Sequence, residues 1–456
     1  MEEKQNATSA MLIILTQTIL LLAASNGAQG TIGVNYGRIA NNLPPPEQVA
    51  KFLLDSTIIS RVRLFDAHPE MLQAFAHTGI AITVTIPNKQ IPMLTNLSFA
   101  GQWVKAYISP YIRSTNIVRI LVGNEVLSTA NKLLISTLVP AMQALHTALV
   151  EESLDRQIQV STPHSLAILS TSTPPSTGRF RQGYDTHVLK PLLSFLKATG
   201  SPFMVNPYPF FGCSADTLDF ALFRPNQGVF DENTGLNYTS MLDAQLDAVF
   251  SGMKGLGYGD VDIVIAETGW PSAGDPSQAG VDPVTAATYN AGLMQHIMLG
   301  AGTPLMPNRT FETYIFALFN EDMKPGPTSE RHFGLFEPDL IPVYDIGILR
   351  QKAAANVSYS PRSPVPELSG KRWCLPRHGA KDQDLQRNID YVCGLGLNCV
   401  PIQAGGRCFL PNTVRAHAAY AMNLYFQTTG RRDHACDFKQ TGAITIADPS
   451  YGGCKY

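Results

Sequence analysis

Residues 261–267 read VDIVIAE, an aliphatic run that ends on a glutamate. The run is continuous rather than alternating, which is typical of a strand buried on both faces of a parallel sheet. Seven other short runs of β-branched or aliphatic residues occur along the chain. They are TIGVNYG (31–37), IISRVRLF (58–65), AITVTIP (81–87), VRILVGNEV (118–126), IQVSTP (158–163), PFMVNPYPF (202–210) and FETYIFALFNE (311–321).

Helix-like stretches separate these runs, among them residues 98–113, 132–152, 186–199, 241–256 and 284–299. Eight strands that alternate with helices over about 320 residues predict an α/β fold of the (β/α)8 TIM barrel type. An open doubly wound sheet is the alternative. It is disfavoured because no G-x-G-x-x-G motif follows the first run.

Composition limits the classes of protein to consider. Of the 456 residues, 45% are hydrophobic and 15% are charged, which excludes a disordered chain and allows a large core. The formal net charge is -2, so no basic field is available to attract nucleic acid. Lys and Arg minus Asp and Glu give -1 for residues 1–30, -6 for residues 31–370 and +5 for residues 371–456.

The N-terminus carries one apolar run, MLIILTQTILLLAA (11–24), followed by Ala28 and Gly30 at the spacing of a cleavage site. We interpret residues 1–30 as a secretory signal peptide, with a membrane anchor as the alternative. The C-terminus, SYGGCKY, lacks the hydrophobic tail of a lipid-anchor signal. The mature protein is therefore expected outside the membrane, secreted to the extracellular space or cell wall, with the vacuole as the alternative destination.

Export makes N-glycosylation available to the chain. Four N-x-[ST] sequons lie beyond the signal peptide, at Asn96, Asn237, Asn308 and Asn356.

The C-terminal part has a different composition. Residues 358–372, SYSPRSPVPELSGKR, are rich in proline and serine and predict a semi-rigid linker after the barrel domain of residues 31–357. Residues 373–456 hold six of the seven cysteines, which predicts a small module stabilised by three disulfides. Six cysteines can pair in 15 ways, and zinc is disfavoured because no C-x-x-C pair occurs. They are Cys374, Cys393, Cys399, Cys408, Cys436 and Cys454.

Two glutamates stand where barrel enzymes place their reacting groups. Glu125 lies at the end of ILVGNEV and Glu267 ends VDIVIAE, so both are expected at the carboxyl ends of strands. A loop glutamate or half of an ion pair is the alternative for either one alone. Paired carboxylates suit the hydrolysis of a glycosidic bond, because one can donate a proton while the other attacks the anomeric carbon or activates water.

The segment VIAETGWPSAG resembles the signature of plant glycoside hydrolase family 17, the endo-β-1,3-glucanases. The segments IGVNYG, VGNEV, NPYPFF and FNEDMKPGPTSERHFGLF resemble the same family, so the likeness spans residues 31 to about 357. The resemblance implies a retaining mechanism, with Glu267 as the nucleophile and Glu125 as the acid/base. It also implies substrate-binding roles for further residues, namely Tyr36, Asn124, Tyr208, Phe211, Trp270, Glu321, Lys324 and Glu330. Packing in the barrel rim is the alternative for the aromatic residues. The three charged residues could instead hold Glu267 in place or form a solvated group on a loop.

Other chemistries have little support in the sequence. The ten histidines form no H-E-x-x-H motif and no G-x-S-x-G occurs, so neither metal nor serine catalysis is expected. We expect no metal and no cofactor. Cys213, the one cysteine outside the C-terminal module, is interpreted as a buried free thiol.

The C-terminal segments RWCLP, YVCGLGLNCVPIQAGGRCFLPNT, HAAYAMNLYFQ and CDFKQTGAIT resemble carbohydrate-binding module family 43. The resemblance implies binding of β-1,3-glucan and the pairs Cys374–Cys436, Cys393–Cys399 and Cys408–Cys454. Lys439 and Gln440 depart from the family, where small residues are expected. The candidate sugar contacts are aromatic: Tyr391, Tyr420, Tyr425 and Phe426. Because Tyr420 and Phe426 occur at helical spacing in AYAMNLYF, a core position is the equal alternative for these two.

The sequence therefore predicts a secreted, monomeric endo-hydrolase of β-1,3-glucan, such as callose or fungal wall glucan. Two alternatives stay open. The first is a glucan-binding wall protein without turnover, and the second is a transglycosylase that uses the same two glutamates.

Overall fold

The computed structural model describes residues 30–350, except 277 and 279, and residues 372–456, except 378–379, 396, 430–432, 446–448 and 451–452. The described residues divide into two compact units, one before residue 358 and one after it. The predicted signal peptide and linker, apart from Gly30 and Arg372, lie outside the described residues, and so does Asn356.

The first unit is built on one sheet of parallel strands. Each of the eight predicted runs contributes to it, and the run 158–163 contributes to two strands. The strands are β1 Ile32–Tyr36, β2 Arg61–Leu64, β3 Ala81–Ile86, β4 Ile117–Val122, β5 Gln159–Ser161, β6 Pro163–Ser165, β9 Phe203–Asn206, β12 Ile263–Thr268 and β13 Thr313–Ile315.

The sheet closes on itself through β5 and β6. The strand order is β5-β4-β3-β2-β1-β13-β12-β9-β6, so these two strands stand at its two ends. They are also consecutive in the chain, with only Thr162 between them, and they pair with β4 and β9 respectively. One segment thus joins both edges, and the predicted TIM barrel is confirmed.

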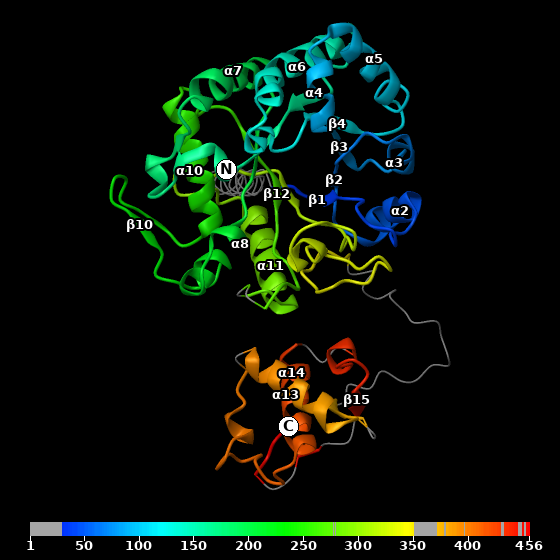
Figure 1. Cartoon of the computed structure of the whole chain (residues 1–456), viewed down its shortest axis with the longest axis vertical. Helices are drawn as coiled ribbons and strands as arrows, with labels where there is room; N and C mark the ends of the chain where they lie inside the picture. Colours follow the sequence, from blue (N-terminus) through cyan, green and yellow to red (C-terminus); the bar gives the residue numbers. More distant parts are fainter. Residues whose placement is uncertain are drawn as a thin grey trace, which may run out of the picture. The chain divides into compact units, whose positions relative to one another are not determined.

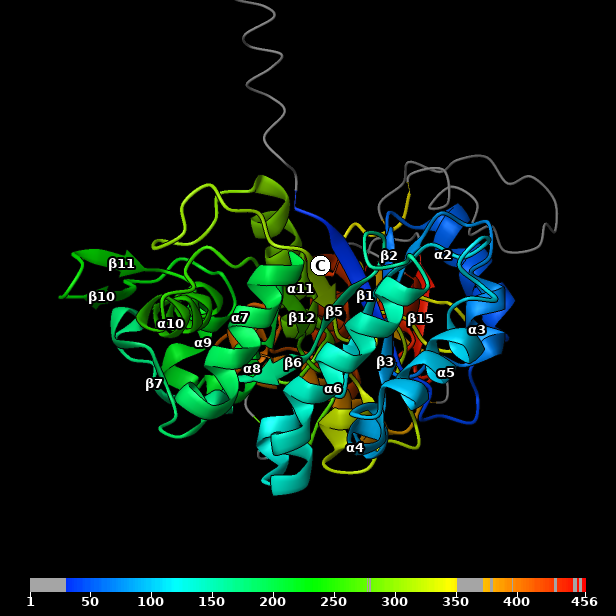
Figure 2. The ribbon, with the colours of Figure 1, turned by 90° about the horizontal axis from the view of Figure 1, so that it is seen from above.

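Helices surround the strands, as Figures 1 and 2 show. Five of them match the predicted helical stretches, although the helix in 98–113 already ends at Tyr107. The main helices of this unit are α2 Pro46–Ser56, α3 Pro69–Ala74, α4 Ile91–Leu94, α5 Leu97–Tyr107, α6 Lys132–Glu151, α7 Lys190–Thr199, α10 Met241–Gly255 and α11 Pro283–Leu299.

Helix α6 is long and apolar enough to cross a membrane by length and composition. It begins after Asn131, whose side chain accepts hydrogen bonds from the backbone amides of Leu133 and Leu134. Its apolar residues Met142 and Leu145 are fully buried in the hydrophobic core of the barrel unit. Its apolar character therefore serves packing between helix and sheet.

Two predicted strands are shorter than expected. β13 covers three residues of the run 311–321, and the backbone beyond it is irregular, with Phe316 N donating to Thr268 O at 2.8 Å. β9 ends at Asn206 because Pro207 and Pro209 have no amide hydrogen for a ladder. The chain leaves both strands as loops at the carboxyl end of the barrel.

Short elements interrupt the barrel after β6 and β9. One antiparallel hairpin joins β7 and β8, and a second joins β10 and β11. The second is held on its inner side by the buried Asp231, which accepts hydrogen bonds from Ser176 N and Oγ at 2.9 Å each. These elements are β7 Leu169–Thr171, β8 Arg179–Phe180, α8 Pro209–Gly212, α9 Leu218–Ala221, β10 Val229–Asp231 and β11 Leu236–Tyr238.

The second unit is small and held by disulfides. Two helices, α13 Asp382–Gly394 and α14 Val414–Thr428, pack with an antiparallel pair, β14 Trp373–Pro376 and β15 Gly442–Thr445 (Figure 1). Leu385, Met422 and Phe426 are fully buried in its core. The disulfides are Cys374–Cys436, Cys393–Cys399 and Cys408–Cys454, the pairing that the family resemblance implies.

Candidate active site

The two candidate carboxylates lie at the carboxyl ends of barrel strands. Glu267 is the penultimate residue of β12 and is 7% exposed. Glu125 follows β4 by three residues, after Gly123 and Asn124. Because all barrel strands are parallel, both side chains belong to the same end of the barrel.

Glu267 is held by two donors from other parts of the barrel. Arg63 of β2 donates from Nη1 to Oε1 at 2.7 Å, and the Tyr208 hydroxyl donates to Oε2 at 2.9 Å. Arg63 is fully buried, so this ion pair is shielded from water. Both oxygens of Glu267 are thus engaged by donors, which suits an ionised carboxylate with a fixed orientation.

Arg63 also connects the surroundings of the two glutamates. Its Nη2 donates to Asn124 Oδ1 at 2.7 Å, next to Glu125, while Nη1 also lies 3.3 Å from Asn35 Oδ1. Neither Arg63 nor Asn35 was predicted from the sequence. One signal was present, since a charged residue inside the buried run IISRVRLF needs a partner.

Glu125 lies in a strained and partly desolvated setting. Its backbone is left-handed, with φ 49 and ψ 39, a conformation that costs a non-glycine residue about 1–3 kcal/mol. Asn206 Nδ2 donates to Glu125 Oε1 at 2.7 Å. Burial, and then the negative charge of Glu267, raise the pKa of Glu125, while Asn206 and Arg63 act in the opposite direction. A raised pKa favours the protonated form that a general acid needs.

Asn88 fixes the backbone just before Glu125. Its Oδ1 accepts from Asn124 N at 2.8 Å and its Nδ2 donates to Asn124 O at 3.0 Å. Gly123 has φ +74, and a Cβ there would lie 2.6 Å from Asn88 Oδ1. Neither contribution was predicted, because Asn88 belongs to a short 3-10 helix, Asn88–Gln90, that lies 36 residues before Asn124 in the chain.

A glycine substitution tests this arrangement. We expect Gly123→Ala to lower the free energy of unfolding by about 2–3 kcal/mol, because it adds a steric clash to an unfavourable φ. Gly79 is the matched control, with φ +73 and no atom within 4 Å of the Cβ that alanine would add. Urea unfolding should give a cost of only about 1 kcal/mol for Gly79→Ala. Equal losses for both variants contradict the role of the clash.

The aromatic candidates divide into exposed and buried residues. Phe211 is 64% exposed, and Tyr208 packs beside it with ring centroids 5.4 Å apart. The prediction for Trp270 as a sugar platform is wrong, because Trp270 is fully buried and its Nε1 donates to Gly280 O at 2.7 Å. Phe210 packs against its ring and supports the exposed Phe211.

Glu321, another predicted site residue, lies in a buried position. It is 3% exposed and its Oε1 accepts from Ile39 N at 2.7 Å, so its contacts are with the loop after β1 rather than with an open surface. Burial raises the pKa of Glu321. Gly37 makes the contact feasible, because a Cβ there would clash with the Glu321 carboxylate.

The remaining candidates lie near this loop. Lys324 Nζ is 3.6 Å from Glu330 Oε2 and 4.0 Å from the centroid of the Phe316 ring. Tyr36 is almost fully buried, yet it lines a pocket of about 350 Å³ together with Arg38 and Asp66. Sugar contact by Tyr36, Lys324 and Glu330 stays a prediction.

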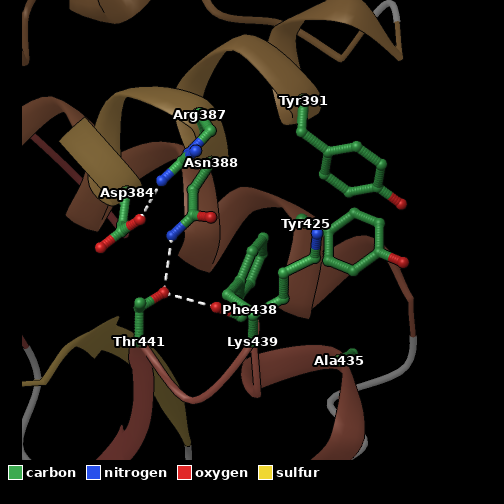
Figure 3. Close-up of a pocket in the computed structure, with 9 residues that line it drawn as sticks. All are labelled: Asp384, Arg387, Asn388, Tyr391, Tyr425, Ala435, Phe438, Lys439 and Thr441. Atoms are coloured by element: carbon green, nitrogen blue, oxygen red, sulfur yellow. Dashed lines mark hydrogen bonds and ion pairs between the residues drawn. The ribbon is translucent and has the colours of Figure 1, made fainter.

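The second unit has a pocket of its own, of about 640 Å³. Figure 3 shows the rings of Tyr391 and Tyr425 side by side, with both hydroxyls pointing the same way. An Arg387–Asp384 ion pair and a 2.8 Å bond from Asn388 Nδ2 to Thr441 Oγ1 form the opposite part of the lining. The pocket combines aromatic faces with polar groups, the usual lining of a ligand site.

The other two aromatic candidates of this unit lie outside that pocket. Phe426 is fully buried, so of the two alternatives for this residue the core position is the one observed. Tyr420 packs edge-on against Tyr456, 6.0 Å between centroids. Phe438, Lys439 and Gln440 have φ of 42, 55 and 65, which explains why small residues were expected at the last two positions.

The fold is a (β/α)8 barrel, and Glu125 and Glu267 stand at the carboxyl ends of its strands, each hydrogen-bonded to other side chains. This combination is typical of the glycoside hydrolases. Residues 32–348 match glycosyl hydrolases family 17, and residues 372–443 match the X8 domain. The chain belongs to glycosyl hydrolases family 17.

Named proteins are similar to this chain over nearly its whole length or over about two thirds of it. A glucan endo-1,3-beta-glucosidase of Triticum aestivum is 51% identical, covering 97% of this chain and 99% of the relative. A glucan endo-1,3-beta-D-glucosidase of Olea europaea is 45% identical, covering 99% and 98%. Among solved structures, a β-1,3-glucanase and allergen of Cryptomeria japonica pollen, CJP38, is 43% identical, with a TM-score of 0.66, covering 70% of this chain and 99% of that one.

Proposed function

We propose that the chain is a secreted endo-hydrolase that cuts internal β-1,3-glucosidic linkages and retains the configuration at the anomeric carbon. The names of the wheat and olive relatives support the substrate class, because both align over nearly the whole length of this chain. The candidate active site supports the chemistry, because its two glutamates differ in their environments.

The proposed reaction has two steps. Glu125, protonated, donates its proton to the leaving glycosidic oxygen while the Glu267 carboxylate forms a bond to the anomeric carbon. The leaving glucan departs, and Glu125, now ionised, takes a proton from the water that breaks the glycosyl–Glu267 bond. Asn124, whose Oδ1 accepts from Arg63 Nη2, binds the 2-hydroxyl of the sugar at the reaction centre in this proposal.

One observation carries this proposal. Arg63 binds Glu267 directly and binds Asn124, the neighbour of Glu125, through its other terminal nitrogen. A single buried guanidinium thus fixes the relative positions of the nucleophile and the segment that bears the acid.

Laminarin, a soluble β-1,3-glucan, tests the function. We expect new reducing ends, a mixture of shorter oligosaccharides from early times, and a β-anomer as the first product seen by NMR. No new reducing ends would indicate a binding protein without turnover, and products longer than the substrate would indicate a transglycosylase.

The pH dependence offers a test of Glu125. Turnover should fall as the pH rises through the pKa of Glu125, because the acid then loses its proton. Asn206→Ala removes a donor that favours the ionised form, so the pKa should rise further and this alkaline limb should move to higher pH. A plot of log kcat/KM against pH measures the shift. A limb that stays in place or moves to lower pH contradicts the assignment.

We further propose that the second unit binds β-1,3-glucan in the pocket beside Tyr391 and Tyr425. Flat apolar faces of glucosyl rings can stack on these two rings, and the polar side of the pocket can bind hydroxyl groups. The unit would then keep the catalytic domain close to insoluble polymer and raise its local concentration there.

Tyr391→Ala tests the pocket in the full chain. Tyr391 is 43% exposed, so its removal should not disturb the core. We expect retention on insoluble β-1,3-glucan to fall about threefold to tenfold, the range expected for one aromatic contact. Turnover of soluble laminarin should not change. Leu410→Ala, at a residue 69% exposed outside the pocket, is the control. If Tyr391→Ala and Leu410→Ala are retained equally on insoluble glucan, the pocket is not the glucan-binding site.

Export, a monomeric state and a location in the extracellular space or cell wall belong to the same proposal. The apolar run and the sequons of the sequence support export.

A further inference from the structure

The outer face of the β10–β11 hairpin carries an unusual pair of residues. Phe230 of β10 is directly opposite Asn237 of β11 in the antiparallel register. Side chains of directly opposed residues lie on the same face of the hairpin, about 4.5–5.5 Å apart at Cβ. Phe230 is 59% exposed and Asn237 is exposed as well, so both point away from the barrel.

The inner face of the same hairpin is firmly attached to the barrel unit. Asp231 and Tyr238 are fully buried, and the Tyr238 hydroxyl donates to Asp247 Oδ2 at 2.9 Å. The orientation of the outer face is therefore fixed. Covering the exposed face of the Phe230 ring would remove apolar area from water, which is favourable by about 25 cal/mol per Å².

Asn237 is also the first residue of the sequon Asn237-Tyr238-Thr239. Its Nδ2 donates to Gln227 O at 3.3 Å, and glycosylation of an amide nitrogen leaves one hydrogen for that bond. The side chain of Asn237 lies against the backbone of Gly228, and a Cβ at residue 228 would be only 2.5 Å from Asn237 Nδ2. The folded geometry around Asn237 is thus compatible with an attached glycan.

We infer that Asn237 is N-glycosylated and that the first N-acetylglucosamine of the glycan stacks on the Phe230 ring. This inference rests on the proposed export of the chain. The donor is a polyprenyl-diphosphate-linked oligosaccharide. Asn237 Nδ2 forms a bond to the anomeric carbon and loses one proton, while the bond from that carbon to the lipid diphosphate breaks and the diphosphate leaves. The sugar then covers the ring from the neighbouring strand with its apolar C–H face.

The other described sequons lack this pairing. Asn96 caps α5, with its Oδ1 accepting from Phe99 N at 3.2 Å, and Asn308 lies in a loop with φ 63. Neither is paired across a strand with an aromatic residue in the described part of the chain. A glycan at Asn96 therefore serves as an internal control.

The test uses the full chain secreted from a plant or yeast cell. Glycopeptide mass spectrometry should show occupancy at Asn237, and NMR should show upfield-shifted N-acetylglucosamine protons that return to normal positions in Phe230→Ala. Amide exchange in residues 229–238 should be about threefold to tenfold slower than in Thr239→Ala, which removes the sequon at an exposed residue and keeps Asn237.

Ser98→Ala, which removes the sequon at Asn96 while keeping the cap, should leave exchange in the hairpin unchanged. An unmodified Asn237 in the secreted protein overturns the inference. A glycan at Asn237 also overturns it if the N-acetylglucosamine protons are not shifted upfield and amide exchange in the hairpin is not slowed. Laminarin hydrolysis by the same samples reports on the proposed function separately, because neither Phe230 nor Thr239 belongs to the candidate active site.

Discussion

Glu267→Gln should lower kcat on laminarin by about 10⁴-fold or more, because the amide cannot form the covalent bond to the anomeric carbon. The amide is nearly isosteric with the carboxylate. Its oxygen can still accept from Arg63 while its NH2 donates to the Tyr208 hydroxyl oxygen, so the fold should persist. Binding of laminarin should therefore remain.

A control variant and an azide-rescue experiment test whether the loss of turnover is specific to Glu267 as the nucleophile. Glu337→Gln is the same chemical change at an exposed residue whose Oε1 accepts from Asn320, and it should leave turnover unchanged. Azide added to Glu267→Gly should restore turnover and give an α-glucosyl azide, whereas azide with Glu125→Gly should give the β-anomer. Full activity of Glu267→Gln, or the opposite anomers, contradicts the two assignments.

Arg63→Lys should lower kcat about 100-fold or more while the chain stays folded. Lysine keeps the positive charge, but one ammonium cannot replace the two terminal nitrogens that reach Glu267 and Asn124. A misplacement of catalytic groups by about 1 Å is sufficient for a loss of this size.

Arg61→Lys is the matched control on the same strand. Arg61 lies two residues earlier in β2 and pairs with Glu312 at 3.4 Å, near the start of β13 and away from the two catalytic candidates. Kinetics of both variants on laminarin should show a large loss in kcat only for Arg63→Lys. Similar losses for both variants would mean that Arg63 acts through stability rather than through the site.

The barrel fold could be predicted because each strand is marked by residues that are neighbours in the sequence. Each barrel strand is a run of buried aliphatic residues, and Glu125 and Glu267 lie at the ends of such runs. The closure through β5 and β6 was not predictable in this way. It depends on a change of pairing partner at Thr162, which no property of a short segment reveals.

The candidate site could be predicted in part, since the structure links the predicted Glu267, Tyr208 and Asn124 through hydrogen bonds. Arg63, Asn88 and Asn206 act through hydrogen bonds to residues 36 to 204 positions away, and such distances require the folded barrel. Trp270, in contrast, was predicted as a residue of the site and is buried instead. Its place after a strand end favoured an exposed platform, yet its ring packs against Phe210 and Tyr289 beneath the surface.

The most direct test of the proposed mechanism is to trap the glycosyl-enzyme with a 2-deoxy-2-fluoro-laminaribiosyl donor that has a good leaving group. The mechanism predicts one covalent adduct per chain, which peptide mass spectrometry places on Glu267. An adduct on Glu125, or hydrolysis with inversion and no adduct, would contradict it.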